Sequence, residues 1–268
     1  MEYLQATFLA ILQGFTEFLP ISSSGHLILP AELLGWQDQG LVFDVSVHVG
    51  SLAAVIYYFR AQIVALGLAW VRSLGQQGST EESKLAWLII VATVPAGLAG
   101  LLANDLVELY ARSILLIAVT SIVFALLLYM SDRQSGTPGN LSNLTWKTAL
   151  LIGLAQMLAL LPGTSRSGVT MTAGLFVGLS RHAAAQFSFL LAIPIIAASG
   201  LLKSIDFYQL GAGVSEWITL LYGAVVSGVV SYFCIHYFLK LIERIGFFPF
   251  VVYRVLLGLL LFAVYFTR

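Results

Sequence analysis

The chain has 268 residues, of which 59% are hydrophobic and only 10% are charged, and its thirteen basic residues balance thirteen acidic ones. Soluble domains carry about 25% charged residues, so this composition excludes an ordinary soluble protein and predicts an integral membrane protein. The zero net charge argues against a nucleic-acid-binding surface. Because no polar segment is long enough for a soluble domain, we expect a single membrane domain over residues 1–268.

Eight apolar stretches follow one another along the chain. The first, Met1–Leu34, and the fifth, Thr148–Leu179, are interrupted near the middle by Pro, Gly and Ser. The other six are long enough to cross about 30 Å of hydrocarbon as helices. These six are Leu41–Phe59, Leu85–Ala103, Ser113–Met130, Ala184–Leu202, Trp217–Leu239 and Phe247–Phe266. The sequence therefore predicts an all-α membrane protein with six transmembrane helices and two interrupted segments.

The two interrupted stretches are interpreted as re-entrant helix hairpins. A break at membrane depth is tolerated only where protein or a water-filled cavity covers the freed backbone groups. Two short half-helices that enter and leave by the same face meet this requirement, in residues 1–34 and again in residues 148–179. Two ordinary spans, or one kinked span, are the alternatives for each stretch.

A weak internal repeat relates the two hairpins. A shift of 143 positions lays Gln13 on Gln156, and it also aligns two serines and a glycine of the first hairpin with those of the second: Ser22 with Ser165, Ser24 with Ser167, Gly25 with Gly168. Each hairpin is followed by three spans, and this odd number inverts the second copy relative to the first. We therefore predict an inverted-topology repeat, residues 1–130 and 148–268, with the two hairpin tips meeting near the bilayer midplane.

The distribution of basic residues predicts the orientation. One face carries three of them, Arg112, Lys203 and Arg268. The other carries eight, namely Arg60, Arg72, Lys84, Arg133, Lys147, Arg181, Lys240 and Arg244. The positive-inside rule places the second face in the cytoplasm and both termini outside.

Arg166 is the most costly residue to bury, because a charged side chain at membrane depth costs about 3 kcal/mol or more. It could form a structural ion pair with Glu17, or it could bind phosphate with its planar guanidinium. Small residues and hydroxyl donors around it favour an anion site, as does a half-helix that starts near Gly168 and directs its positive end at the ligand. The neighbouring residues are Gly163, Thr164, Ser165, Ser167 and Thr170.

The first hairpin supplies a different chemistry. A carboxylate such as Glu17 beside a phosphate site can hold a divalent cation or move a proton. His26 titrates near neutrality and suits general acid–base catalysis, and the serines 22–24 offer a nucleophile or ligands. Together with Arg166, these groups suit phosphoryl transfer, with either Ser23 or water as the attacking group. His48, His182 and His236 show no ligand spacing and are expected to pack or to lie at the interface, and Arg254 is expected to pair with an acid or extend to the interface.

These motifs resemble those of the undecaprenyl-diphosphatase family, also called the bacitracin resistance protein family. That family carries an (E/Q)xxxE motif, here Gln13 to Glu17, followed by FLPISSSGH, here Phe18 to His26. It also carries PGxSRSxxT, here PGTSRSGVT at Pro162 to Thr170. Both motifs are intact and in order, and the pattern of spans agrees over the whole length.

The resemblance implies a multi-pass enzyme of the bacterial plasma (inner) membrane that converts undecaprenyl pyrophosphate to undecaprenyl phosphate, the lipid carrier of cell-wall synthesis. It implies a divalent cation, Mg²⁺ or Ca²⁺, with Glu17 as a ligand, and an active site that opens to the extracytoplasmic side. We expect four catalytic residues, Glu17, Ser23, His26 and Arg166. We expect six substrate-binding residues, Gln13, Ser22, Ser165, Ser167, Gly168 and Thr170. A homo-oligomer is compatible with the sequence.

Two other classes compete with this interpretation. A transporter or flippase for an anionic lipid would also use an inverted repeat and a buried arginine, but transport alone does not require Glu17, Ser23 and His26. A membrane phosphatase with a histidine nucleophile would share Ser24-Gly25-His26, but it also needs Lys and Arg-Pro upstream and a second His with Asp downstream, and this chain has neither arrangement.

Overall fold

The computed structural model describes residues 3–75, 79–103, 113–134, 139–209 and 214–267, without the side chains of residues 41 and 203–216. The long helices are α1 (Tyr3–Thr16), α2 (Ser23–Leu34), α3 (Gly40–Tyr58), α4 (Arg60–Ser73), α5 (Glu81–Leu102), α7 (Ile114–Gln134), α8 (Trp146–Met157), α9 (Arg166–Phe176), α10 (Arg181–Gln209), α11 (Val214–Ile245) and α12 (Phe248–Phe266). Two short 3₁₀ helices, Leu141–Asn143 and Leu158–Leu160, flank α8.

Five helices in the described part of the chain are long and apolar enough to cross a membrane: α5, α7, α10, most of α11, and α12. A sixth candidate is the pair formed by α3 and α4, which is bent by 79° at Phe59. Many large apolar side chains on these helices are exposed, such as Leu102, Leu221 and Leu256, as expected for surfaces that face lipid. The chain is therefore a multi-pass membrane protein.

The sequence did not predict α4, Arg60–Ser73. Its 14 residues are too few to span a bilayer, so hydropathy alone did not distinguish them from a connection between spans. In the structure α4 continues from α3 after the bend and packs against α5. Of the basic residues that predict the orientation, Arg112, Arg268 and the side chain of Lys203 lie outside the described residues.

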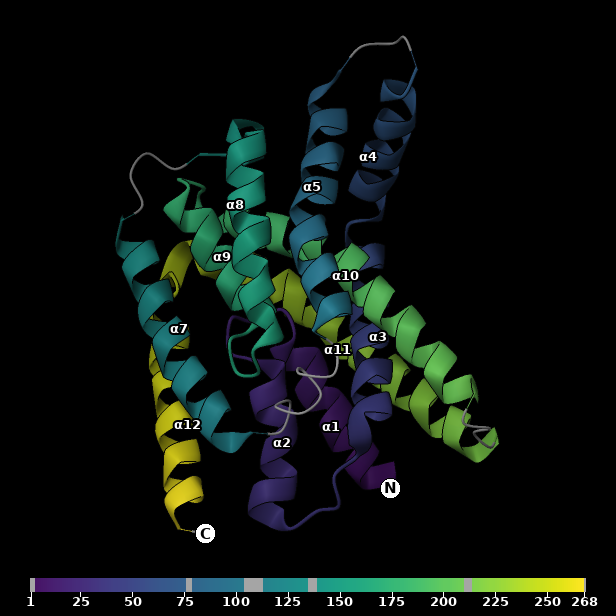
Figure 1. Ribbon diagram of the computed structural model, residues 1–268, viewed down its shortest axis with the longest axis vertical. Coiled ribbons are helices and arrows are strands. Elements are labelled where there is room, and N and C mark those ends of the chain that lie inside the picture. The colour runs from purple at the N-terminus through teal and green to yellow at the C-terminus, as the bar shows by residue number, and fades with distance from the viewer. Residues whose placement is uncertain (1–2, 76–78, 104–112, 135–138, 210–213, 268) are drawn as a thin grey trace.

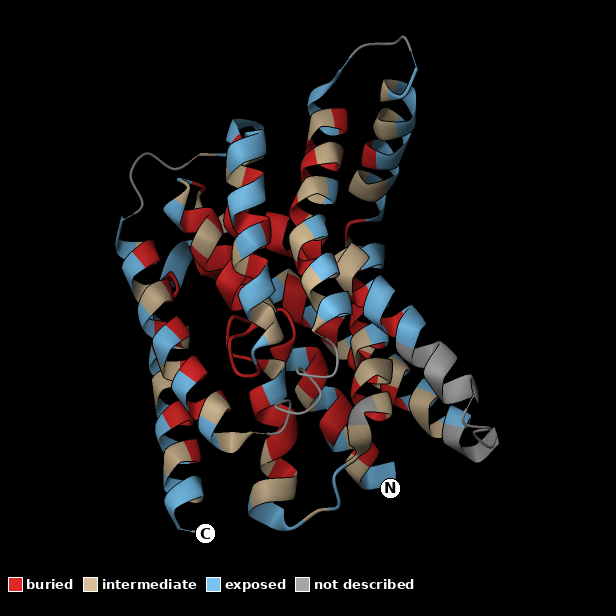
Figure 2. Cartoon of the chain, viewed as in Figure 1, coloured by how far each residue is buried: buried red, intermediate tan, exposed pale blue. Residues whose placement is uncertain are grey.

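Both interrupted stretches are helix pairs joined by a short loop. Helices α1 and α2 extend inward from the end of the molecule where α12 also ends, whereas α8 and α9 extend inward from the opposite end (Figure 1). The two loops meet among the buried residues in the middle of the molecule (Figure 2). Ser167 Oγ donates to the carbonyl of Leu19 at 2.9 Å, and the Gly163 amide donates to Ser24 Oγ at 3.3 Å. The expected meeting of the two tips is thus present.

The two halves of the chain pack into each other rather than side by side. Helix α1 packs against α11, and α8 packs against α5, so that the first helix of each hairpin contacts the other half. Glycines permit both contacts, because a side chain at Gly14 would collide with the carbonyl of Ser227, and one at Gly153 would collide with the backbone of Ala92. Small residues of this kind allow membrane helices to approach closely.

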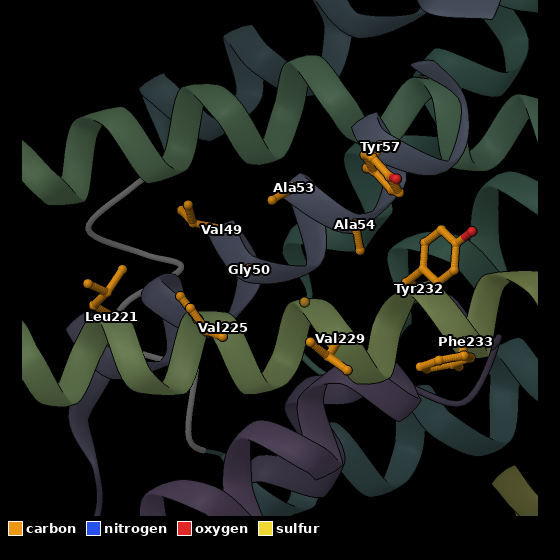
Figure 3. A pocket seen from close by; sticks show the side chains of 12 residues that line it. Val49, Gly50, Ala53, Ala54, Tyr57, Leu221, Val225, Val229, Tyr232 and Phe233 are labelled. Carbon is orange, nitrogen blue, oxygen red and sulfur yellow. The ribbon is translucent and has the colours of Figure 1, made fainter. Parts of the chain in front are cut away.

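Helices α3 and α11 border an apolar groove of about 570 Å³ on the outside of the bundle (Figure 3). Gly50 of α3 approaches α11 so closely that a side chain there would collide with the backbone of Ala224. Beneath the groove, the hydroxyl of Ser231 lies 2.9 Å from Ser51 Oγ and 3.1 Å from the Gly14 carbonyl. These contacts fix α3 and α1 against α11 and so help to position the first hairpin.

Candidate active site

The two hairpin tips share an uncommon backbone conformation at equivalent serines. Ser22 has φ 71° and Ser165 has φ 68°, in the left-handed region that residues other than glycine rarely adopt. Each serine caps the half-helix that follows, since Ser22 Oγ accepts from the Gly25 amide and Ser165 Oγ accepts from the Gly168 amide. The sequence repeat therefore corresponds to a repeated local structure. Backbone strain of this kind concentrates at functional sites.

Glu17 lies at the centre of the contacts between the tips. Its Oε2 atom accepts from Gln13 Nε2 at 2.9 Å and from Ser23 Oγ at 3.0 Å, and it lies 3.2 Å from His48 Nε2. Its Oε1 atom accepts from Arg166 Nη2 at 2.9 Å. Glu17 is 7% exposed, so these four polar partners compensate for most of the cost of burying its charge. One carboxylate thus joins three separate segments of the chain.

Arg166 comes from the second tip and has two fixed contacts. It forms the ion pair with Glu17, and its Nη1 atom donates to the carbonyl of Ser188 at 2.9 Å. The ion pair that a purely structural role would require is therefore present. The arginine also lines a cavity, so its remaining donors can reach a ligand there.

This cavity has a volume of about 240 Å³ and two chemically different sides. The first tip, α3 and the second tip supply the polar side: Glu17, Ser22, Ser23, Ser24, His48, Ser165 and Arg166. Helices α5 and α10, with the residues that follow α8, supply an apolar side: Ala96, Ala159, Leu160, Leu161, Ile195 and Ile196. Gln156 and Ser199 complete the lining. A cavity with this division suits a ligand that has an anionic head and an apolar tail.

His26 does not line this cavity, although the sequence predicted it beside Glu17. Its Nδ1 atom lies 2.7 Å from the carbonyl of Ser22, and its Nε2 atom lies 2.6 Å from the hydroxyl of Tyr253. The ring also stacks on Tyr253, with the centroids 5.5 Å apart. Both ring nitrogens are engaged, and the contact with Tyr253 joins α2 to α12.

Three predicted substrate-binding residues of the second tip also lie outside the cavity lining. Ser167 donates to the carbonyl of Leu19, and Thr170 Oγ1 lies 2.7 Å from Ser188 Oγ. Gly168 has no room for a side chain, because a Cβ atom there would lie 2.7 Å from Arg254 Nη1. These residues stabilise the tip that carries Arg166.

His48 was expected to be a packing or interfacial residue, and the structure corrects this expectation. Its Nε2 atom contacts Glu17, and its Nδ1 atom lies 2.6 Å from the carbonyl of Asp44 one turn earlier in α3. The only signal in the sequence was a histidine within an apolar span, where an ionisable residue is by default a candidate for function.

Arg254 is a second residue whose position the sequence did not reveal. It is fully buried in α12 and, in the described part of the chain, neither pairs with an acid nor extends to the interface. It donates instead to carbonyl oxygens of both tips, Pro20 at 3.3 Å, Gly163 at 3.0 Å and Thr164 at 2.9 Å, and to that of Ser121 in α7. One guanidinium therefore holds both tips in place.

Within the described residues, no three His, Cys, Asp or Glu side chains gather as ligands for a metal ion. Gln13 Nε2 donates to Glu17 Oε2, and the buried Oε1 atom of Gln13 has no hydrogen-bond partner there. Oxygen ligands suit Mg²⁺ and Ca²⁺, and Mg²⁺ is commonly held by one or two carboxylates together with substrate phosphates. Glu17 also lines the cavity, so its carboxylate fits a cation that arrives with a phosphate ligand.

The family model described as "Bacitracin resistance protein BacA" matches residues 6–260. "Undecaprenyl-diphosphatase 1" of Pseudoalteromonas translucida (strain TAC 125) is 55% identical over 258 residues, which cover 96% of this chain and 97% of the relative. "Undecaprenyl-diphosphatase" of Aliivibrio salmonicida (strain LFI1238) is 53% identical over 263 residues, 98% of each chain. The protein of that name from Hahella chejuensis (strain KCTC 2396) is 54% identical over 258 residues, 96% of each chain. These matches extend over both hairpins and confirm the resemblance found in the sequence motifs, so the chain belongs to the bacitracin resistance protein BacA family.

Proposed function

We propose that this protein hydrolyses undecaprenyl pyrophosphate to undecaprenyl phosphate and inorganic phosphate, and so recycles the lipid carrier for cell-wall synthesis. The observation that carries the proposal is the position of Arg166 on the second tip, in one cavity with Ser23 and Glu17 on the first. A phosphate-binding guanidinium, a hydroxyl and a carboxylate in one cavity are the groups that phosphoryl transfer requires. The names of the relatives support this substrate.

In the mechanism we favour, Ser23 attacks the terminal phosphorus. Glu17 Oε2, which already accepts the hydrogen bond of Ser23 Oγ, takes the hydroxyl proton. The new bond between Ser23 Oγ and phosphorus forms as the bond from phosphorus to the bridging oxygen breaks, and undecaprenyl phosphate leaves. Glu17 passes its proton to the departing lipid phosphate and is again a carboxylate. Water then attacks the phosphoserine and gives a proton to Glu17, which returns it to Ser23 Oγ as the bond from Ser23 to phosphorus breaks and inorganic phosphate leaves. Arg166 stabilises the charge on the transferred group in both steps.

An alternative mechanism uses water directly. In that case Ser23 orients the water molecule, Glu17 acts as the base and no covalent intermediate forms. The hydrogen bond between Ser23 and Glu17 favours the first mechanism, because it places a nucleophile and its base in contact.

We assign His48 the role for which the sequence suggested His26. His48 lines the cavity and contacts the same carboxylate oxygen as Ser23. From this position it can fix the orientation of Glu17 and exchange a proton with a phosphate oxygen in the cavity. His26 keeps a positioning role through Tyr253.

A divalent cation is part of the proposal, with Glu17 as its protein ligand in the cavity. When bound, Mg²⁺ or Ca²⁺ would neutralise part of the diphosphate charge and polarise its oxygens. Gln13 is neutral, so it leaves Glu17 as the single anionic ligand of the protein.

The polyprenyl tail is proposed to leave the cavity between α5 and α10. Helix α5 supplies Ala96 to the cavity and, less than one turn away, Thr93 and Val94 to an apolar groove of about 440 Å³. Helix α10 likewise supplies Ile195 and Ile196 to the cavity and contributes Ile193 to the groove. An apolar channel that begins at the apolar side of the cavity is the expected place for a hydrocarbon chain.

Filling this groove is expected to discriminate against long substrates. Val94→Trp should lower kcat/KM for undecaprenyl pyrophosphate about tenfold more than for farnesyl pyrophosphate, because displacing about two buried CH₂ groups costs roughly 1.6 kcal/mol. The matched control is Val229→Trp in the groove between α3 and α11 (Figure 3), where the ratio should stay at the wild-type value. Equal losses of kcat/KM for both substrates in Val94→Trp would contradict the proposal that the tail binds in this groove.

For the membrane arrangement we propose one domain of six spans and two re-entrant hairpins, with residues 1–130 and 148–268 as inverted repeats. The hairpins that extend inward from opposite ends and the reciprocal packing of α1 with α11 and α8 with α5 support this proposal. We further propose that both termini lie outside the cytoplasm in the bacterial plasma membrane, and that the active site opens to the same side. The excess of basic residues on the opposite face supports this orientation.

Cysteine labelling tests the orientation. In cells treated with a membrane-impermeant thiol reagent, Thr267→Cys should react at once and Ser79→Cys only after the membrane is permeabilised. The native Cys234 is buried and serves as the background. Labelling of both positions from one side of intact membranes would contradict the inverted arrangement.

Hydrolysis by purified protein in detergent tests the proposed function against the transporter alternative. Release of inorganic phosphate from undecaprenyl pyrophosphate, dependent on a divalent cation, is the expected result. Transport needs a sealed membrane and hydrolysis does not. A folded protein that releases no phosphate in detergent but moves the lipid between leaflets in vesicles would establish the transporter instead.

A further inference from the structure

Gln156 is a buried side chain that the proposed chemistry does not yet use. It lies near the end of α8, is 1% exposed and lines the cavity. Neither its Oε1 nor its Nε2 atom has a hydrogen-bond partner in the described part of the chain. A buried polar group without a partner destabilises the folded protein. A folded protein that tolerates this cost beside a binding cavity indicates a ligand that supplies the missing partner.

The repeat explains why Gln156 is without a partner. Its counterpart Gln13 donates to Glu17, four residues later in the same turn. Four residues after Gln156 the chain has Leu160, which cannot accept a hydrogen bond. The second hairpin thus retains the amide but not the carboxylate, and the donor hydrogens of Gln156 are available to the cavity.

The position of Gln156 in the cavity indicates which part of the substrate it contacts. It is on the segment that also supplies Ala159, Leu160 and Leu161 to the apolar side of the cavity. The proposed tail leaves on this side, whereas Ser23 and Arg166 lie on the polar side, where the terminal phosphate must be for attack. A diphosphate between them places its lipid-linked phosphate next to the apolar side.

We propose that the Gln156 amide donates a hydrogen bond to the lipid-linked phosphate of the prenyl diphosphate, and that it therefore binds the leaving group. This inference rests on the proposed function. When the bond from the terminal phosphorus to the bridging oxygen breaks, negative charge grows on the lipid-linked phosphate. A neutral donor at that place stabilises the departing charge, whereas a carboxylate such as the one beside Gln13 would repel it.

Product inhibition separates this subsite from the rest of the cavity. The probes are farnesyl phosphate, which carries a lipid-linked phosphate, and inorganic phosphate, which resembles the transferred group. In Gln156→Leu the inhibition constant of farnesyl phosphate should rise about tenfold, and that of inorganic phosphate should stay within about twofold of wild type. Gln156→Glu should lower kcat/KM further than Gln156→Leu, because it adds a negative charge beside the phosphate.

Gln156→Met serves as a second apolar replacement that keeps the length of the side chain, in case Gln156→Leu fails to fold. An equal rise in both inhibition constants, or no change in either, would overturn the assignment. Full activity in Gln156→Glu would overturn it as well. Should the wild-type protein release no phosphate, the proposed function fails, and calorimetric binding of farnesyl phosphate to wild type and to Gln156→Leu still decides whether the subsite exists.

Discussion

A protein that carries Glu17→Gln is expected to lose at least about 10³-fold in kcat. Glutamine is nearly isosteric with glutamate, but it cannot take the proton of Ser23, and general base catalysis contributes about 10²–10⁴-fold. The substitution also removes the negative partner of Arg166, whose side chain is 12% exposed, so the charge of the guanidinium is no longer balanced. We therefore expect a loss of thermal stability in addition to the loss of turnover, because breaking a buried ion pair by removing one partner is destabilising.

Asp132→Asn separates these two effects. Asp132 also pairs with an arginine, since its oxygens accept from Arg181 at 2.6 and 3.1 Å, but it does not line the cavity. This control should lower the melting temperature and leave kcat near the wild-type value. If a folded Glu17→Gln protein kept more than about a tenth of the wild-type kcat, Glu17 would have no part in the catalytic step.

Ser23→Ala is expected to abolish turnover if Ser23 is the nucleophile. The hydroxyl of Ser23 contacts Glu17, and Ser23 lines the cavity. Alanine leaves no atom that could attack phosphorus. Ser23→Cys should retain a slow reaction or accumulate a phosphorylated protein, which intact-protein mass spectrometry after acid quenching would detect as an added phosphoryl group.

Ser199→Ala is the matched control for Ser23→Ala, because Ser199 lines the same cavity from α10 and, within the described residues, its hydroxyl donates to the Ile196 carbonyl and not to Glu17. Its kcat should be close to that of wild type. Substantial phosphate release by Ser23→Ala would show that water attacks the phosphorus. The remaining catalytic groups would then be Glu17, His48 and Arg166.

The features that the sequence predicted correctly depend on local chemistry. Long apolar runs were enough to locate α5, α7, α10 and α12, since hydrocarbon imposes a minimum length on each span. The interruptions in the two hairpins were visible because Pro, Gly and Ser are costly inside a span. The ion pair between Glu17 and Arg166 was one of two alternatives for the arginine, the other being a phosphate site, because burying its charge alone is costly.

The features that the sequence did not predict depend on how distant helices are rotated. His26 is close to Ser23 along the chain, but the direction of its ring is set by Tyr253, 227 residues later. His48 reaches Glu17 only because α3 packs against α1 and α11. The carbonyl groups that bind Arg254 carry no signal in the sequence, because every residue has one.

The central claim is that the two tips form a single catalytic site, and a double-mutant cycle on phosphate release tests it most directly. The variants are Glu17→Asp, Arg166→Lys and the double variant, all measured as kcat/KM for undecaprenyl pyrophosphate. Arg166→Lys keeps the charge but loses the planar fork, so it should cost about tenfold or more, roughly 1.4 kcal/mol. Residues that act together in one site couple by about 0.5–3 kcal/mol. We predict a double variant that is less impaired than the product of the two single losses by at least about 1 kcal/mol, whereas losses that multiply within about twofold would show that Glu17 and Arg166 act independently.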